Sequence, residues 1–309
     1  MTLVQLRYAL AVAGCRSLSQ AASGLCITQP ALSNALKELE RELGIGIFRR
    51  SSHGIEVTRQ GEEFLGYARN IVTQSDMLLD RYTGAEKTSV RFVVSSQHYS
   101  FAVSAFIRLV RTFGMDIYDF CLRETRTREI ISDVHNLAAD IGVIYLSDRN
   151  RRYMSRLLRD EELEFTPLAS YAPHVFISRS NPLAQKSLVT LEELKMLPFI
   201  CFEQGRYEND FMAEEIITDR TGTRVIRVSD RATLFNLLLG LNGYTVASGV
   251  ISPELNPEIA SVSLEAEGEM EIGVIRHRSS VPGPLYHRYV EYLRQELCAG
   301  EAGAQSEEA

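Results

Sequence analysis

Three polar residues at helical spacing could recognise a nucleic acid. Gln29, Ser33 and Lys37 follow one another at intervals of four, so on a helix they share one face. Gln can bond adenine edges, Ser can bond bases or phosphate, and Lys neutralises phosphate charge. A helix that carries them could enter a DNA major groove, although any amphipathic helix pair in a bundle shows a similar pattern.

The surrounding sequence predicts two short helices joined by a tight turn. Ser17, followed three residues later by Gln20, is a capping-box start for the first helix. Thr28 caps the second helix, whose first turn tolerates Pro30 because the missing amide would have no partner there. Opposite the polar face, apolar residues fall at helical spacing: Leu32, Ala35, Leu36, Leu39 and Leu43.

A small hairpin, or wing, is predicted directly after this helix pair. Residues 45–58 contain two short apolar segments around a Ser-Ser-His-Gly turn. We expect Arg49, Arg50 and His53 in this wing to touch a sugar-phosphate backbone.

The charge distribution agrees with a nucleic-acid-binding head. The chain has 309 residues and a net charge of -7, but residues 1–60 hold seven Lys and Arg against four Asp and Glu, a net +3. The acidic excess therefore lies downstream. A basic head on an acidic body suits docking on DNA in one orientation.

The segment from Leu6 to Ala68 resembles the DNA-binding domain of LysR-type transcriptional regulators. The matching residues are Ser17-Leu-Ser-Gln-Ala-Ala22, Leu25, Thr28-Gln-Pro-Ala-Leu-Ser33, Leu39-Glu40, Leu43-Gly44, Phe48-Arg49-Arg50 and Thr58-Arg-Gln-Gly61. The resemblance implies that Gln29, Pro30 and Ser33 approach base edges or phosphates. Asn34 stands where the family often has Arg, and Asn can bond a base edge but cannot pair with phosphate as Arg does. We expect a winged helix-turn-helix domain at 1–58 whose DNA-binding residues are Ser17, Ser19, Thr28, Gln29, Pro30, Ser33, Asn34, Lys37, Arg49, Arg50 and His53.

A long helix is predicted from residue 59 to about Tyr82, in a linker segment that ends near residue 87. Its apolar residues alternate at spacings of four and three, as in a coiled coil. The stripe could pack on the same chain, but we expect it to pair with a second copy. The resemblance supports this expectation, because the family dimerises through such a helix and often forms tetramers. The expected dimerisation residues are Phe64, Ala68, Ile71, Leu78 and Tyr82.

From Val90 the pattern changes to short apolar strands alternating with helices, which is typical of an α/β fold with a mostly parallel sheet. The strands expected are 90–95, 117–122, 141–145, 199–202, 225–228 and 245–247. The helices expected are 101–113, 127–137, 210–221, 232–239 and 285–297.

The same family resemblance implies a two-lobed effector domain similar to periplasmic binding proteins (type 2). The order of elements and Ala139-Asp-Ile-Gly-Val143 carry this resemblance. We place the domain at 88–298, with lobe I at 88–161 and 266–298 and lobe II at 162–265. The tail 299–309 is rich in Gly, Ala and Glu and is expected to be disordered.

Two predicted strand ends carry polar residues that could bind a ligand. In α/β sheets, ligands lie beyond the carboxyl ends of strands, where helix amino termini offer free amides. The predicted effector-binding residues are Ser95, Ser96, Gln97, His98, Thr125, Arg126 and Thr127, joined by Phe202 and Glu203 through family position. Hydroxyls, amides and helix dipoles suggest a small anionic effector, although Ser and Thr at helix starts are often ordinary caps.

The sequence lacks the features of the competing classes of protein. It contains no phosphate-binding loop, dinucleotide fingerprint or nucleophile elbow, so we expect no enzyme and no cofactor. Its six histidines lack metal-ligand spacing, and its five cysteines form no pair; Cys201 alone is a candidate redox sensor, although a core role is the more usual one for a free cysteine. Without a signal pattern or a membrane span, a cytoplasmic location is expected.

These observations predict a cytoplasmic, ligand-responsive regulator. Its expected partners are double-stranded DNA, a small-molecule effector, further copies of itself and RNA polymerase, but no membrane. The alternative is a two-lobed small-molecule-binding protein, or an enzyme, with an accessory helix-turn-helix.

Overall fold

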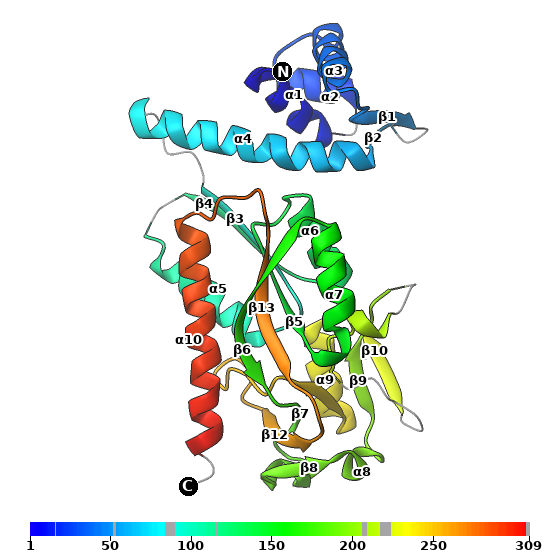
Figure 1. Ribbon diagram of the computed structural model, residues 1–309, viewed down its shortest axis with the longest axis vertical. Coiled ribbons are helices and arrows are strands. Elements are labelled where there is room, and N and C mark those ends of the chain that lie inside the picture. The colour runs from blue at the N-terminus through cyan, green and yellow to red at the C-terminus, as the bar shows by residue number, and fades with distance from the viewer. Residues whose placement is uncertain are drawn as a thin grey trace. The chain divides into compact units, whose positions relative to one another are not determined.

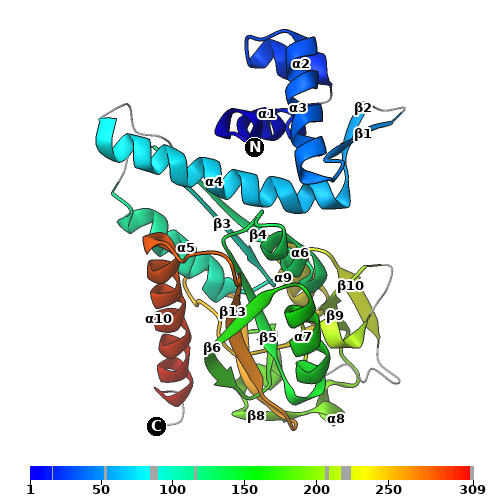
Figure 2. The same cartoon turned by 45° about the horizontal axis from the view of Figure 1, so that its top comes forward.

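Three short helices and a hairpin form the amino-terminal head (Figure 2). In the computed structural model, which describes residues 1–15, 17–51, 54–83, 90–114, 117–205, 209–216 and 224–306, both predicted helices and the hairpin are present. Ala21 and Ala22 lie in the head's core, where their small side chains allow the helices to approach closely. The elements are α1 (Leu3–Ala13), α2 (Leu18–Gly24), α3 (Gln29–Leu43), β1 (Phe48–Ser51) and β2 (Gly54–Val57).

The predicted linker helix is α4 (Arg59–Thr83). Thr58 caps it, because its Oγ1 accepts a hydrogen bond of 2.9 Å from the Gly61 N–H. Part of its apolar stripe is used within the head, where Ala68 and Val72 pack against Leu6 of α1.

The chain forms two units, and α4 belongs to the first of them. The first unit comprises 1–90 with the short stretches 117–119 and 135–138, and the second comprises the remainder. The second unit contains two lobes, each built on its own sheet.

The sheet of lobe I has five strands in the order β4-β3-β5-β13-β6. Strands β3 and β5 are parallel, whereas β13 runs antiparallel to β5 and β6. Helices α5 and α10 cover one side of this sheet, and α6 and α7 cover the other (Figure 1). The bounds are β3 (Val90–Ser96), β4 (Tyr118–Glu124), β5 (Ile141–Leu146), β6 (Leu163–Tyr171), β13 (Met270–His277), α5 (Ser100–Thr112), α6 (Thr127–His135), α7 (Asp148–Asp160) and α10 (Pro284–Ser306).

Alternating side chains of β3 explain why both faces of this sheet are buried. Phe92 and Val94 belong to the cluster that includes α5 and α10, and Val93 belongs to the cluster that includes α6 and α7. A strand that is covered on both faces contains a continuous run of apolar residues. Such runs in the sequence predicted β3 and β5.

The sheet of lobe II has six strands in the order β10-β9-β11-β7-β12-β8. Helix α9 packs on it through Leu234 and Leu238, which join a cluster with Phe176 and Ile200. The elements are β7 (His174–Ser178), η1 (Pro182–Gln185), β8 (Leu188–Thr190), α8 (Leu191–Leu194), β9 (Phe199–Phe202), η2 (Asp210–Met212), β10 (Val225–Val228), α9 (Arg231–Leu241), β11 (Tyr244–Ala247) and β12 (Ile259–Glu265).

Two expectations about the sheets were wrong. The sheets are mixed rather than mostly parallel, because β7 pairs antiparallel with β11 and β12, and β13 pairs antiparallel on both sides. The chain passes into lobe II after Tyr171 rather than near residue 162, since β6 stays paired with β13 up to that residue. The chain returns to the sheet of lobe I between β12, which ends at Glu265, and β13, which begins at Met270.

Two expectations about helices were also wrong. In the described part of 210–221, residues 210–212 form a short 3-10 helix and 213–216 are not helical. Helix α10 continues to Ser306, where a disordered tail had been expected from residue 299. Ala and Glu are strong helix formers, and they let the helix continue despite two glycines.

Candidate functional site

The polar face of α3 is accessible, as the sequence predicted. Gln29, Asn34 and Lys37 are exposed and Ser33 is half-exposed, whereas Leu32 and Leu39 on the other side are fully buried. Thr28 caps the helix by accepting a hydrogen bond of 3.4 Å from the Ala31 N–H. The remaining predicted contact residues of the helix pair, Ser17, Ser19, Thr28 and Pro30, are also exposed.

The wing is tied to α3 by a carboxylate. Glu40 Oε1 accepts hydrogen bonds from the backbone N–H groups of Ile47 and Phe48, at 2.7 and 3.1 Å. Exposed Arg49 forms a 2.9 Å ion pair with Glu56 on the opposite strand, which offsets part of its charge. His53 and the side chain of Arg50 lie outside the described residues.

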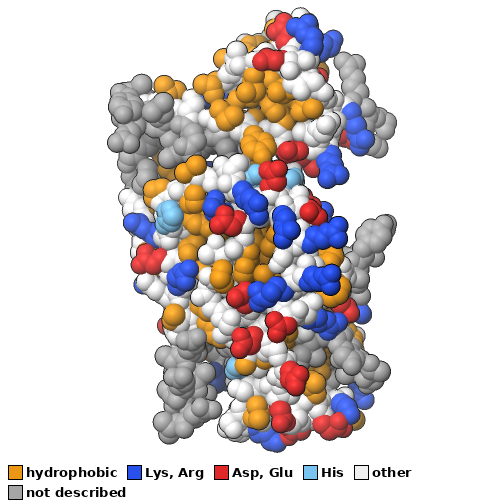
Figure 3. Space-filling model, in the orientation of Figure 1, with side chains coloured by type: hydrophobic (Ala, Val, Ile, Leu, Met, Phe, Trp, Pro, Cys, Tyr) orange, Lys and Arg blue, Asp and Glu red, His pale blue; other side chains and the backbone are white. Residues whose placement is uncertain are grey.

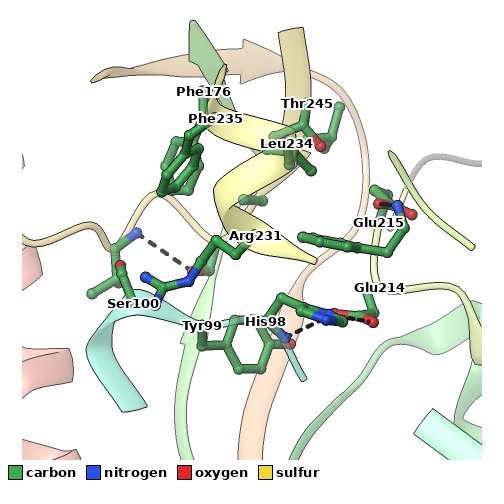
Figure 4. A pocket seen from close by; sticks show the side chains of 15 residues that line it. His98, Tyr99, Ser100, Phe176, Glu214, Glu215, Arg231, Leu234, Phe235 and Thr245 are labelled. Carbon is green, nitrogen blue, oxygen red and sulfur yellow. Dashed lines mark hydrogen bonds and ion pairs between the residues drawn. The ribbon is translucent and has the colours of Figure 1, made fainter. Parts of the chain in front are cut away.

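A second candidate site is a cavity between the two lobes of the second unit (Figure 4). The empty space at this site is about 500 Å³, a figure that includes open solvent at its mouth. Lobe I contributes the β3–α5 connection, and lobe II contributes parts of β7, β9, α9 and β11. The lining residues are His98, Tyr99, Ser100, Phe176, Phe202, Glu214, Glu215, Arg231, Leu234, Phe235, Thr245, Val246, Ala247, Ser248 and Val250.

A buried pair, His98 and Glu214, joins the lobes at this cavity. Glu214 Oε2 lies 2.9 Å from both the backbone nitrogen and the ring Nδ1 of His98. The two side chains are 3% and 5% exposed. Burial lowers the pKa of His98, but the hydrogen bond and the charge of Glu214 outweigh burial and raise that pKa above its usual value. The His98 ring also stacks on Phe202, with 4.0 Å between ring centroids.

A second ion pair crosses between the lobes beside the cavity. Arg231, the first residue of α9, lies 3.0 Å from Glu124 at the end of β4. Burial raises the pKa of Glu124, and the charges of Arg231 and His98 oppose that rise. Figure 4 shows the Arg231 side chain extending from α9 toward Ser100 of lobe I.

Most residues predicted to bind an effector lie outside the cavity. Of the nine, His98 and Phe202 line it and the other seven do not. Ser96 is fully buried, and its hydroxyl donates to the carbonyl oxygen of Gln97 at 2.6 Å. The Gln97 amide donates to Thr127 Oγ1 at 2.6 Å, and the Ser95 hydroxyl donates to Asp133.

The second predicted cluster lies at the polar contact between the lobes. Arg126 forms an ion pair with Glu203, and the Thr127 hydroxyl donates to the Met212 carbonyl oxygen at 2.9 Å. The Thr125 hydroxyl donates to Glu129 at 2.7 Å. These donors already have partners from the chain. The contacts of Arg126 and Thr127 join the two lobes, whereas the contact of Thr125 stays within lobe I.

The sequence patterns did not reveal Glu214, Arg231, Phe176 or Phe235, which also line the cavity. Arg231 had a readable signal, since it begins a helix directly after strand β10, the arrangement that drew attention to His98. Glu214 had no comparable signal, because it lies in an irregular segment that the sequence assigned to a helix.

The second unit carries a basic surface despite the acidity of the downstream sequence. Figure 3 shows Lys and Arg side chains gathered over α6 and α7. Helix α7 holds five arginines in thirteen residues. Arg149 and Arg151 pair with Asp210 and Glu271, at 3.3 and 2.8 Å, so neighbouring carboxylates offset part of this charge.

The described residues give no support to a metal site, a membrane span or a redox thiol. Within the described ranges, no group of three His, Cys, Asp or Glu side chains could hold a metal ion. No described helix is long and apolar enough to cross a bilayer. Cys201 is fully buried in β9, with its Sγ 3.8 Å from the Ile226 carbonyl oxygen, an environment typical of a core residue.

Comparison with protein families gives two matches that together cover most of the chain. A model of the bacterial regulatory helix-turn-helix protein, lysR family, matches residues 3–62, and the LysR substrate binding domain matches residues 119–298. YnfL of Escherichia coli (strain K12), named an uncharacterized HTH-type transcriptional regulator, is 31% identical over 202 residues, 64% of each chain and thus less than two thirds. YvbU of Bacillus subtilis (strain 168), named in the same way, is 24% identical over 274 residues, 84% of this chain and 89% of YvbU.

Solved structures support the same fold. A full-length OxyR variant from Pseudomonas aeruginosa is 20% identical and aligns with a TM-score of 0.61 over 96% of this chain and 97% of that one. CbnR, crystallised in a complex with its target DNA, is 20% identical and aligns with a TM-score of 0.55 over 96% of this chain and 100% of CbnR.

Proposed function

The chain belongs to the LysR family of DNA-binding transcriptional regulators, and from that premise we propose that α3 reads a double-stranded operator while the inter-lobe cavity receives a small-molecule effector. The exposed face of α3 carries the DNA proposal. Gln29, Ser33 and Lys37 lie on that face with the side-chain chemistry that base edges and phosphates require.

Further contacts, from α3 and from the elements around it, would fix the orientation of the head on DNA. Ser17, Ser19 and Thr28 are hydroxyl residues near helix amino termini, where phosphate is favoured. Asn34 offers an amide to a base edge, and Arg49 in the wing offers charge to the backbone. Arg50 and His53 remain predictions of the same kind.

The proposed regulation is a shift between populations of the effector domain. An effector that binds the cavity would favour one arrangement of the lobes, and the dimer would pass that preference to the spacing or angle of its DNA-reading heads. In a homodimer or homotetramer acting in the cytoplasm, such a change would alter operator bending and the access of RNA polymerase.

Operator binding by the purified full-length protein tests the proposal. Duplexes from the region upstream of its own gene would be titrated at low ionic strength, with a shuffled duplex as the control. We expect saturable binding that prefers the upstream duplex and weakens as salt rises. Equal affinity for both duplexes, or no binding at low salt, would refute operator recognition.

A further inference from the structure

The cavity is chiefly apolar. Eight of its fifteen lining residues are aromatic or aliphatic, including the three phenylalanines Phe176, Phe202 and Phe235. A ligand that enters such a cavity gains most of its binding free energy from apolar contact and shape, with a few polar groups to orient it.

The charges around the cavity leave no excess of positive charge. His98 is matched by Glu214, and Arg231 is matched by Glu124. Glu215 adds a further carboxylate, whose Oε1 accepts the Phe202 N–H at 2.8 Å. An anion that bound here would lose its hydration without an uncommitted cation to replace it.

His98 Nε2 is a buried polar atom of the lining that a ligand could satisfy. His98 lines the cavity and its side chain is 3% exposed, yet among the described residues no partner lies within hydrogen-bonding distance of its Nε2. Glu214 occupies Nδ1, and stacking on Phe202 fixes the plane of the ring. With Nδ1 bonded to Glu214, Nε2 is an acceptor in the neutral imidazole and an N–H donor in the imidazolium, the form that the buried carboxylate of Glu214 favours. A buried donor without an acceptor is costly, so a ligand that supplies one gains affinity.

We infer that the cavity accepts a small uncharged molecule with an aromatic ring and one hydrogen-bond acceptor, which bonds His98 Nε2. This inference rests on the proposed function in taking the cavity as the effector site. It replaces the anionic effector expected from the sequence, because the hydroxyl and arginine donors behind that expectation have partners in the chain.

Four single-ring probes of similar size test the charge and the acceptor separately. Acetophenone is neutral with an acceptor, ethylbenzene is neutral without one, benzoate is anionic, and benzylammonium is cationic. Isothermal titration calorimetry on the full-length protein at neutral pH should rank acetophenone first, about tenfold tighter than each of the others. Tighter binding of benzoate, benzylammonium or ethylbenzene, or no binding of acetophenone up to its solubility limit, would overturn the inference.

A variant pair tests the role of His98. The double variant His98→Phe with Glu214→Gln keeps a ring on Phe202 and removes the donor without leaving a buried carboxylate unpaired. We expect its preference for acetophenone over ethylbenzene to fall to about one. Arg156→Gln, which changes an exposed residue of α7 outside the cavity lining, should keep the preference. If the double variant does not fold, the order of the four probes on the wild-type protein still decides the question.

Operator binding on the same samples separates the two proposals. A protein that binds its operator but ranks the probes differently would contradict the ligand class alone. A protein that binds no operator would contradict the proposed regulator, whatever the probes do.

Discussion

The carboxylate of Glu214 lies 2.9 Å from both the backbone nitrogen and the ring Nδ1 of His98, although 116 residues separate the two in the chain. His98 follows β3 in lobe I, and Glu214 belongs to lobe II. Since both side chains are almost fully buried, water screens their interaction little. The protonation state of one imidazole therefore affects how firmly the lobes are held together.

This pair predicts a pH-dependent stability of the second unit. The pKa of His98 is near 6.5 in the unfolded chain. In the folded protein burial lowers this pKa, but the hydrogen bond and the charge of Glu214 raise it above 6.5. A raised folded pKa means that the stabilisation is complete below pH 6.5 and is lost as pH rises through the folded pKa. The melting temperature of the wild-type protein should therefore fall from pH 6.5 upward, as measured by circular dichroism.

Glu214→Gln supplies the comparison for this titration. The variant should lose most of the decline in melting temperature, because an amide does not favour the imidazolium as a carboxylate does. Glu124 and Arg231 also act on the charge of His98, so the comparison should be repeated in a Glu124→Gln background. Parallel melting curves for the wild type and Glu214→Gln across the range would exclude this coupling.

Replacing Gln29 or Ser33 with Ala should reduce sequence discrimination. Removing one base contact should cost about 1–3 kcal/mol against the preferred base, while affinity for unrelated duplexes stays nearly constant. Fluorescence anisotropy with the operator and with singly substituted duplexes would measure the difference. Gln295→Ala removes a similar exposed side chain in α10 and should leave discrimination intact.

Lys37→Ala should act through phosphate rather than through bases. Without one phosphate contact, binding to all duplexes should weaken by a similar factor, and the slope of log affinity against log salt should fall by about one. Arg156→Ala is the matched control, because it removes an exposed cation from the second unit and should leave the salt slope unchanged. An unchanged salt slope for Lys37→Ala would place Lys37 away from the DNA backbone.

Two glycines of the second unit should respond to alanine with opposite signs. A Cβ at Gly273 would lie 2.3 Å from Phe165 Cζ and 2.6 Å from the Thr166 carbonyl oxygen, so Gly273→Ala should lower the free energy of unfolding by about 1–3 kcal/mol. A Cβ at Gly240 in α9 meets no atom within 4 Å. Gly240→Ala should therefore raise the free energy of unfolding by about 0.5–1 kcal/mol. Urea denaturation would measure both, and a stabilised Gly273→Ala protein would contradict the close approach of β6.

Strands with a single, strong pattern were predictable from the sequence. The predicted bounds of β9 and β10 agree with the structure, because each is a short run of β-branched or aromatic residues between turn signals. Strand β6 was missed. It contains Pro167, and its register with β13 shifts at a bulge there, so its sequence does not resemble a regular strand.

The cavity was less predictable than the head for a physical reason. Residues on α3 share a face through local spacing, which the sequence reveals directly. His98 meets Glu214, and Arg231 meets Glu124, through packing between segments about a hundred residues apart. No local pattern encodes such partners, so the sequence predicted polar residues at these strand ends but not which of them already have partners within the chain.

The linker helix yields the last prediction. Of the five residues expected to mediate dimerisation, Phe64 and Ala68 already pack within the head, and the side chains of Leu78 and Tyr82 lie outside the described residues. Ile71 is 44% exposed, which leaves it available to a partner helix. Ile71→Asp should therefore weaken self-association at least tenfold. A dimer contains two copies of residue 71, and each substitution would remove about 1.5–3 kcal/mol of stabilisation from apolar burial.

Sedimentation velocity over a range of concentrations would measure this change. Val281→Asp makes the same kind of substitution at a residue that is 88% exposed in the second unit, and it should leave the dimer intact. Operator binding should weaken in parallel with dissociation, because two half-sites need two heads. A dimer of unchanged affinity in Ile71→Asp would show that self-association depends on another surface.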